Sequence, residues 1–411
     1  MFDPVAATAG YMAQLSPAAH ARATAYTQGG HWVLLWSWLI GIVVAWLILR
    51  SGVLARLGDR MERKRPHPAL VSIAIAFVFS LLDAILSLPW SIYAGWWREK
   101  SYGLNNQILT AWLSEHAISV VIGAISSALF FLFLYFLIRR APRTWWLWAG
   151  GLAAVAFAFN FLLAPILIDP LFNKYTPAPP GPVRTAIVEL AQQNGVPSDK
   201  IYIYNGSKQS NRYTANVSGL FGSARVAMSD VMFKKGADIS EVRGVVGHEM
   251  GHYVHNHGLW LTLFFGLRAL VGFGLTALIF PFVLRLMGAR GIRGIADPRG
   301  LPTLTVVTAT LTLLATPITV AATRMAESDA DSYSLTHARE PDGLAEALVK
   351  TIDYRASSPS RLEEILFYDH PSVEHRVRKC MGWKAAHLAA AAATARHDED
   401  LEKSMNSAAS R

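Results

Sequence analysis

Cysteine and charge are both scarce in this sequence. Cys380 is the only cysteine among 411 residues, so an internal disulfide and a cysteine-rich metal site are excluded. Charged residues make up 16% of the chain and hydrophobic residues 52%, which is too apolar for an ordinary soluble protein. The N-terminal stretch MFDPVAATAGYMAQL lacks the basic segment and apolar run of a cleavable signal peptide. The composition therefore indicates an integral membrane protein.

The net charge of +9 does not indicate nucleic-acid binding. Basic residues gather in short loops beside apolar stretches, where membrane topology places them. A basic face interleaved with aromatic residues, as nucleic-acid binding requires, is missing from the sequence. The thirteen Trp residues suit a chain with two membrane–water interfaces. We expect the lipid bilayer as a partner and no nucleic acid.

Long apolar runs are abundant, and a bilayer-spanning helix needs about 20 such residues. Six stretches qualify, at about 32–50, 70–96, 116–138, 145–169, 259–285 and 302–323. The expected fold class is a mainly α integral membrane protein with about six transmembrane helices. A small α+β domain is inserted between the fourth and fifth spans.

The insertion has recognisable local patterns. TPAPPGP (176–182) cannot be helical and is typical of a linker. VRTAIVELAQQNG then has apolar residues at helical spacing and a glycine stop, and strands are predicted at 201–205 and 225–230. The expected division of the chain is an N-terminal segment (1–31), four spans (32–170), the insertion (171–258), two spans (259–323), a second polar segment (324–382) and an Ala-rich tail (383–411) that is a frayed helix or disordered.

The most specific motif is HEMGH, residues 248–252. Asp238 and Glu241 are spaced as a capping box, and apolar residues follow at helical spacing. On that helix His248 and His252 share one face and can bind one metal ion. A shift of either histidine by one residue would rotate it by about 100°. Glu249 is placed to hold a water without ligating.

A catalytic zinc usually has three protein ligands and one open position. Candidates for the third ligand are Glu327, Asp329 and Asp331, in the acidic segment after the sixth span. Glu327 and Asp331 lie one turn apart, so one can ligate while the other orients an imidazole. We favour Glu327 and expect Asp329 to be solvated. His255 and His257 are out of phase with His248, so surface or supporting roles are expected for them.

Several segments together resemble the type I CAAX prenyl protease family, typified by the yeast a-factor-converting enzyme. These segments are WSIYAGWWREKSYGLNNQ (90–107), APILIDPLFNKYTPAPPG (164–181), HEMGHYVHNH (248–257), RMAESDAD (324–331) and DHPSVEHR (369–376). The resemblance covers roughly residues 70–380. It implies a ring of transmembrane helices around a water-filled chamber, although six spans are expected here against seven in eukaryotic members.

The resemblance also implies roles for individual residues. His248, His252 and Glu327 would bind one Zn²⁺, and Glu249 would be the catalytic base. Asp331 would support the ligands, while His370 and Arg376 would stabilise the developing oxyanion or fix the substrate backbone. The family holds its substrate peptide with an Asn-Ala-aromatic element on an edge strand, for which this chain has Thr214, Ala215 and Asn216. Backbone pairing of a peptide at such an edge does not depend on these side chains.

The expected activity is that of a membrane-embedded, zinc-dependent endopeptidase acting on a peptide or protein. The alternatives are a quality-control metalloprotease of the heat-shock type and a non-catalytic zinc-binding scaffold. A multi-pass location in the cell inner membrane is expected. Basic loops at 51–68, 139–144 and 286–301 place the polar segments on the periplasmic side by the positive-inside rule, whereas the resemblance implies a cytoplasm-facing site, which we favour. Oligomeric state and natural substrate stay open.

Overall fold

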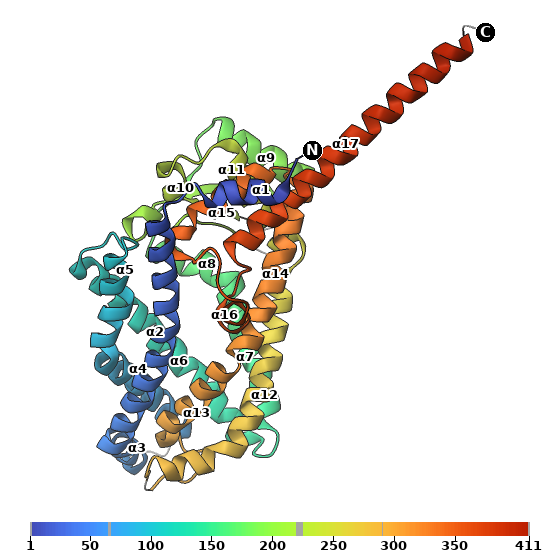
Figure 1. The fold of residues 1–411 in the computed structure, drawn as a ribbon. Coiled ribbons are helices and arrows are strands. Elements are labelled where there is room, and N and C mark those ends of the chain that lie inside the picture. Colours follow the sequence, from blue (N-terminus) through green and yellow to red (C-terminus); the bar gives the residue numbers. More distant parts are fainter. Residues whose placement is uncertain (1, 65–66, 219–224, 290, 410–411) are drawn as a thin grey trace.

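A computed structural model describes residues 2–64, 67–218, 225–289 and 291–409. The described chain is predominantly helical, with one four-stranded sheet at one end of a helical bundle (Figure 1). The longer helices are α1 (Pro4–Met12), α2 (Pro17–Ser51), α3 (Val53–Lys64), α4 (Pro68–Ile92), α6 (Leu109–Arg140), α7 (Trp145–Ala158), α9 (Pro182–Gln193), α11 (Ile239–Val254), α12 (His257–Leu286), α13 (Leu301–Leu314), α14 (Thr316–His337), α15 (Pro341–Lys350) and α17 (Val373–Ala409). Shorter helices are α5 (Arg98–Ser101), α8 (Ala164–Leu167), α10 (Asp230–Lys234) and α16 (Arg361–Phe367).

Five helices within the described residues are long and apolar enough to cross a membrane, and a bent pair supplies a sixth span. The five spans are Pro17–Ser51, Pro68–Ser101, Leu109–Arg140, Trp145–Leu171 and His257–Leu286. The bent pair joins Pro298–Leu314 to Thr316–His337 at an angle of 55°. This arrangement confirms the predicted fold class of about six membrane helices with an inserted α+β domain.

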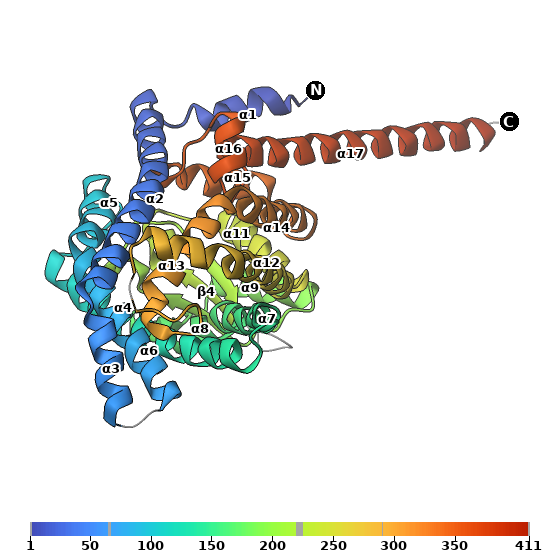
Figure 2. The same ribbon diagram turned by 90° about the horizontal axis from the view of Figure 1, so that it is seen from below.

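The spanning helices surround the long axis of the bundle. Seen from below, α2, α4, α6, α7 and α12 lie toward the outside of the view and α13 lies nearer its centre (Figure 2), while α9 and α11 lie at the far end of the bundle (Figure 1). A cavity of about 650 Å³ lies between α6, α7, α12 and α13, and its walls are mostly apolar.

The first and last helices extend beyond the predicted boundaries. Helix α2 begins at Pro17, well before the apolar stretch at 32–50, and α1 precedes it. The Tyr11 hydroxyl of α1 donates to the Asp342 carboxylate of α15 over 2.9 Å. Helix α17 continues to Ala409 and projects away from the rest of the molecule (Figure 1). The N-terminal segment is thus packed against the C-terminal polar segment.

The sheet has the order β1-β2-β4-β3, formed by β1 (Tyr175–Pro177), β2 (Ile201–Tyr204), β3 (Ala215–Ser218) and β4 (Arg225–Ser229). Strands β2 and β4 were predicted, with β2 parallel to β4, whereas β1 and β3 pair antiparallel to their neighbours. Strand β3 is an edge strand and contacts α11. The sheet and α11 share one apolar core, to which Met228, Val242 and Met250 contribute. The domain therefore offers a free strand edge beside the HEMGH helix.

Candidate active site

Helix α11 begins as the sequence predicts. The Asp238 carboxylate accepts from the Glu241 backbone N–H, and Glu241 accepts from the Asp238 N–H, so both halves of the capping box are present. Glu241 is also buried and accepts from Lys350 Nζ over 2.6 Å. A cap of this kind fixes where the helix starts, and thereby the direction in which each later side chain points.

Glycines on α11 allow α14 to approach it closely. A Cβ atom at Gly247 would lie 2.9 Å from Ala338 Cβ, and one at Gly251 would lie 3.0 Å from Ala330 Cα. The Ser334 hydroxyl of α14 donates to the Gly244 carbonyl over 2.7 Å. This close contact lets a carboxylate of α14 reach the two imidazoles of α11.

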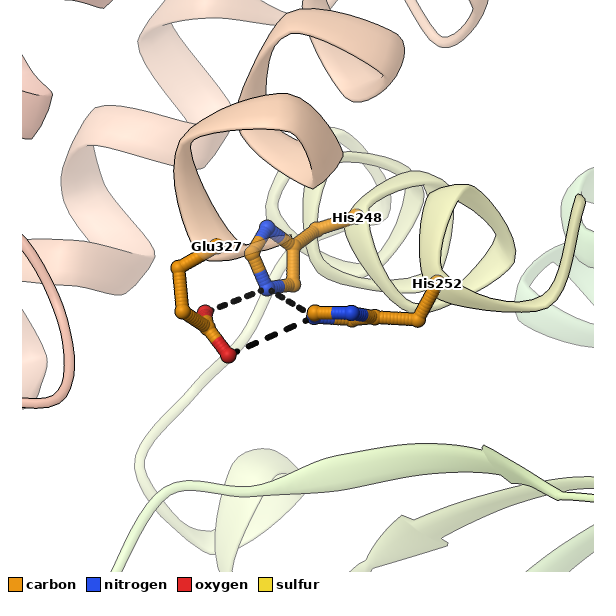
Figure 3. Close-up of side chains that lie close together, drawn as sticks. All are labelled: His248, His252 and Glu327. Carbon is orange, nitrogen blue, oxygen red and sulfur yellow. Dashed lines mark hydrogen bonds and ion pairs between the residues drawn. The ribbon is translucent and has the colours of Figure 1, made fainter. Parts of the chain in front are cut away.

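His248, His252 and Glu327 converge, as Figure 3 shows. The two imidazole Nε2 atoms are 3.2 Å apart. His248 Nε2 lies 3.2 Å from Glu327 Oε2, and His252 Nε2 lies 3.4 Å from Glu327 Oε1. Two ligand atoms at about 2.0–2.1 Å from a tetrahedral ion are separated by about 3.3–3.4 Å. All three separations suit ligands of one metal ion.

The carboxylate of Glu327 is ready to bind a cation. The carboxylate is buried and faces ring nitrogens of His248, His252 and His370 at distances of 3.1–3.4 Å. Its Oε2 atom lies 3.2 Å from His248 Nε2 and 3.1 Å from His370 Nε2. A buried carboxylate is costly unless it is paired, and a metal ion between the three side chains would pair it.

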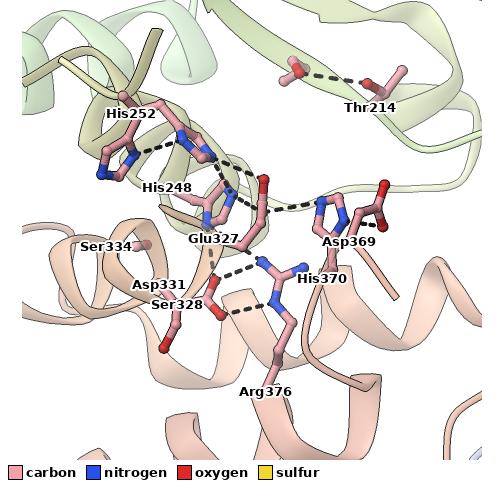
Figure 4. Close-up of polar contacts among 12 residues, drawn as sticks. Thr214, His248, His252, Glu327, Ser328, Asp331, Ser334, Asp369, His370 and Arg376 are labelled. Carbon is pink, nitrogen blue, oxygen red and sulfur yellow. Dashed lines mark hydrogen bonds and ion pairs between the residues drawn. The ribbon is translucent and has the colours of Figure 1, made fainter. Parts of the chain in front are cut away.

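Asp331 holds His248 from the other side (Figure 4). Asp331 Oδ1 lies 2.9 Å from His248 Nδ1, which leaves Nε2 free to ligate. Arg376 donates to both oxygens of Asp331, over 2.8 and 2.6 Å. Sequence spacing thus predicted correctly that Glu327 and Asp331 share one face.

His370 approaches the same carboxylate from the loop before α17. Its Nε2 atom lies 3.1 Å from Glu327 Oε2, and its Nδ1 atom lies 2.8 Å from Asp369 Oδ1. The Arg324 guanidinium donates to the Glu364 and Tyr368 carbonyls and so ties the loop to α14. His370 therefore lies next to the cluster of His248, His252 and Glu327. Arg376, in contrast, is held by its two hydrogen bonds to Asp331.

Glu249 follows His248 on α11 and does not belong to the three-donor cluster. Burial raises its pKa, which the neighbouring His248 and His252 partly oppose. A carboxylate with a raised pKa beside a metal site suits proton transfer near neutral pH.

The predicted substrate-binding residues lie at the start of edge strand β3. Thr214 is exposed, Ala215 is buried, and Asn216 is half-buried with an Oδ1 atom that accepts no hydrogen bond. Asn216 pairs with Ala227 of β4, so the opposite edge of β3 has no strand neighbour in the described sheet.

A second histidine pair, His255 and His257, lies beside the first pair, His248 and His252. The sequence predicted a supporting role for the second pair but not its contacts. His257 Nδ1 lies 2.9 Å from His252 Nδ1, and His257 Nε2 lies 3.1 Å from Asp329 Oδ2. His255 also contacts Asp329. Asp329, expected to be solvated, is half exposed but engages both histidines. Helix phase could not indicate this contact, because α11 ends between His252 and His257.

Two imidazoles and a carboxylate beside a neighbouring glutamate, in a domain inserted among membrane-spanning helices, define the class as a membrane metalloprotease. Two family models match the chain: "CAAX prenyl protease N-terminal, five membrane helices" over residues 7–174 and "Peptidase family M48" over residues 177–384. The chain belongs to the M48 peptidases, and within them to the CAAX prenyl protease family. The predicted family is thereby confirmed.

Two curated proteins and one solved structure are similar to this chain. The chain is 30% identical over 350 residues to the uncharacterized metalloprotease YhfN of Bacillus subtilis, covering 82% of this chain and 81% of YhfN. It is 30% identical over 211 residues to CAAX prenyl protease 1 of Saccharomyces cerevisiae, covering 51% of this chain and 46% of the yeast protein. The crystal structure of S. mikatae Ste24p matches the fold with a TM-score of 0.72 at 20% identity, covering 90% of this chain and 89% of that one.

Proposed function

We propose that the chain is a zinc-dependent endopeptidase of the HExxH-plus-Glu type, in which His248, His252 and Glu327 hold one Zn²⁺. The observation that carries the proposal is the convergence of these three side chains at separations of 3.2–3.4 Å. Two histidines and one glutamate are a usual ligand set of catalytic zinc, with the fourth position open. Soft thiolate ligands are not available, since Cys380 is buried elsewhere.

The side chains around this site divide the catalytic work. Bound zinc supplies a Lewis acid and lowers the pKa of water toward neutrality. Glu249 accepts the proton of the attacking water and returns it to the leaving amine nitrogen. His370 faces the site with Nε2 and donates to the oxygen that gains negative charge in the transition state. Arg376 acts through Asp331, which holds His248 in the ligating tautomer.

The substrate pairs with the free edge of β3 in an extended conformation. Strand addition needs only backbone N–H and C=O groups, and β3 offers such an edge against α11. The Asn216 side chain, whose Oδ1 lacks a donor, lies on this strand beside Thr214 and Ala215. We propose that these residues hold the peptide while the backbone sets its register.

The decisive variant is Glu249→Gln, which keeps the shape of the side chain and removes its basicity. We expect purified Glu249→Gln to retain one zinc per chain and to lose turnover of a quenched-fluorescent peptide by about 100-fold or more. The exposed Glu189→Gln on α9 is the control and should match wild type in both measurements. Turnover by Glu249→Gln at the wild-type rate would remove Glu249 from the mechanism. If wild type and both variants bind zinc but none of them cleaves the peptide, the zinc-binding scaffold is favoured instead.

The printed names of the relatives support a proposal for the substrate class. We propose CAAX-type cleavage of proteins at the inner membrane, because the match to YhfN and the CAAX prenyl protease N-terminal family includes the membrane helices. Sequencing of protein termini in cells with wild type and with Glu249→Gln tests it. Cleavage sites near C-termini, present only with wild type, are expected. Sites scattered through misfolded membrane proteins would instead indicate quality control.

A further inference from the structure

Beside the catalytic site lies a second group of potential metal ligands that the mechanism does not use as ligands. His255, His257 and Asp329 each offer one ligand atom, and these three atoms lie within 4.8 Å of one another. His257 Nε2 and Asp329 Oδ2 are 3.1 Å apart, close to the separation of about 3.3 Å that two ligands of one tetrahedral ion have.

The chain turn between α11 and α12 brings the two histidines together. His255 is the C-cap residue of α11, and His257 is the first residue of α12. Asn256 between them adopts a left-handed conformation, with φ 53° and ψ 37°, which Asn tolerates better than most residues. Without this reversal, two residues spaced i and i+2 on a continuous helix would point in nearly opposite directions.

The group is accessible from solution and has room for a further ligand. The side chains of His255 and Asp329 are 38% and 49% exposed, whereas that of His257 is 4% exposed. A cavity of about 500 Å³ adjoins it, and both His252 and His257 line this cavity. A cation can therefore reach the exposed pair and bind the buried imidazole behind it.

His257 couples this group to the catalytic site. When His252 ligates through Nε2, its proton is on Nδ1 and donates to His257 Nδ1, 2.9 Å away. His257 then carries its proton on Nε2 and donates it to Asp329. A cation bound to His257 Nε2 needs that lone pair, so the ring must take the other tautomer. Two N–H groups would then face each other, and the hydrogen bond that orients His252 would be lost.

We propose that His255, His257 and Asp329 form a second divalent-cation site, and that its occupation inhibits the enzyme. Zinc suits two imidazoles and a carboxylate. Binding at this site stands on the geometry of the three residues. The inhibition rests in addition on the proposed peptidase function, because it acts through the orientation of His252. Loss of an outer-shell partner of a metal ligand typically costs about 10–100-fold in metal affinity or activity.

The test titrates Zn²⁺ against full-length protein in detergent, starting from one bound equivalent. Bound zinc is counted by mass spectrometry and activity is followed with a quenched-fluorescent peptide. His255→Ala removes one ligand of the second site together with its contact to Asp329. All three members of the His252–His257–Asp329 chain are kept. His387→Ala, an exposed histidine of α17 outside both groups, is the matched control.

Wild type and His387→Ala are expected to bind a second equivalent and to lose about tenfold or more of their activity as it binds. His255→Ala is expected to bind one equivalent and to resist the excess of zinc. A single equivalent in wild type, or inhibition of His255→Ala at the same zinc concentrations as wild type, overturns the proposal. Zinc counts on Glu249→Gln repeat the binding test without any hydrolysis, so failure of the peptidase function is distinguished from failure of the second site.

Discussion

Asp331 joins the proposed metal ligand His248 to Arg376 in the interior of the protein. Both Asp331 and Arg376 are buried, and their two hydrogen bonds have the bidentate geometry of strong charge-assisted pairs. The pair fixes one tautomer of His248 and ties α17 to α14. Asp331 and Arg376, which are distant from α11 in sequence, therefore determine which nitrogen of His248 carries the free lone pair.

Asp331→Asn tests this role. We expect metal affinity to fall by about 10–100-fold, because an amide holds His248 less firmly in the ligating tautomer. Stability is expected to fall by about 3–5 kcal/mol, because Arg376 becomes a buried charge without a counter-ion. Competition with a metal chelator and thermal unfolding measure the two effects.

The control for that substitution is Glu374→Gln, which breaks the exposed Glu374–Arg378 pair. Pairs of this exposure contribute about 0–1 kcal/mol, so stability and metal affinity should both stay near wild type. Equal losses in Asp331→Asn and Glu374→Gln would contradict a special role for Asp331.

Among single residues, the sequence predicted what one helix can encode. The spacing of His248, Glu249 and His252, the capping box and the shared face of Glu327 and Asp331 follow from 3.6 residues per turn. The placement of His370 against Glu327 depends on a loop held by Arg324, which no periodicity reveals. The contact of Asp329 with His255 and His257 depends on the chain reversal at Asn256.

At the scale of elements, the site depends on how closely α11 and α14 pack. Gly247 and Gly251 leave no side chain between the helices, so Glu327 reaches two imidazoles that lie about 75 residues earlier in the sequence. The hydrophobic pattern predicted the individual helices but not the close crossing of α11 and α14, because a glycine counts as neither apolar nor polar in such a pattern. The hydrophobic pattern did not reveal the short strands β1 and β3, because three or four residues carry little periodicity. For β3, only the family resemblance indicated an edge strand, at Thr214, Ala215 and Asn216.

Gly251→Ala tests the helix crossing. Its new methyl group would lie 3.0 Å from Ala330 Cα and 2.9 Å from Tyr333 Cβ, so α14 must move away. We expect a loss of about 1–3 kcal/mol in stability, as for other overpacked sites, together with weaker zinc binding. Gly382→Ala on α17, whose methyl group would meet nothing within 4 Å, should keep both properties. Unchanged zinc affinity in Gly251→Ala would mean that this crossing does not position Glu327.

At the scale of the molecule, the basic loops gather at the end opposite the sheet. Arg299 forms ion pairs with Asp59 and Glu62 of α3, and Arg139 donates to Ser72 near the start of α4. Helix α3 and the sheet lie at opposite ends of the bundle (Figure 1). The positive-inside rule would put the α3 end in the cytoplasm, whereas we favour a cytoplasm-facing active site.

Cysteine labelling in intact cells decides the orientation. The single native Cys380 is buried, so it contributes little background. Lys200→Cys, near the sheet, should react with a membrane-impermeant maleimide only after permeabilisation, and Arg60→Cys, on α3, should react without it. Both positions are exposed. The reverse pattern would place the active site on the periplasmic side.

Metal removal should weaken the whole molecule. The proposed metal ion, shared by α11 and α14, would bind only the folded chain. A ligand of this kind at 100 times its Kd adds about 2.7 kcal/mol to the free energy of unfolding. Chelation should therefore lower the Tm followed by tryptophan fluorescence, and zinc should restore it. In Glu327→Ala the same treatment should leave the Tm almost unchanged, and a full zinc response there would contradict the assigned third ligand.

The central claim is that one metal ion joins His248, His252 and Glu327, and anomalous diffraction at the zinc edge tests it most directly. In crystals of the protein loaded with one equivalent of zinc, we expect a single strong anomalous peak about 2.0–2.2 Å from His248 Nε2, His252 Nε2 and a Glu327 oxygen. A peak elsewhere, or a metal held by the two imidazoles with the Glu327 carboxylate outside bonding distance, would contradict the account.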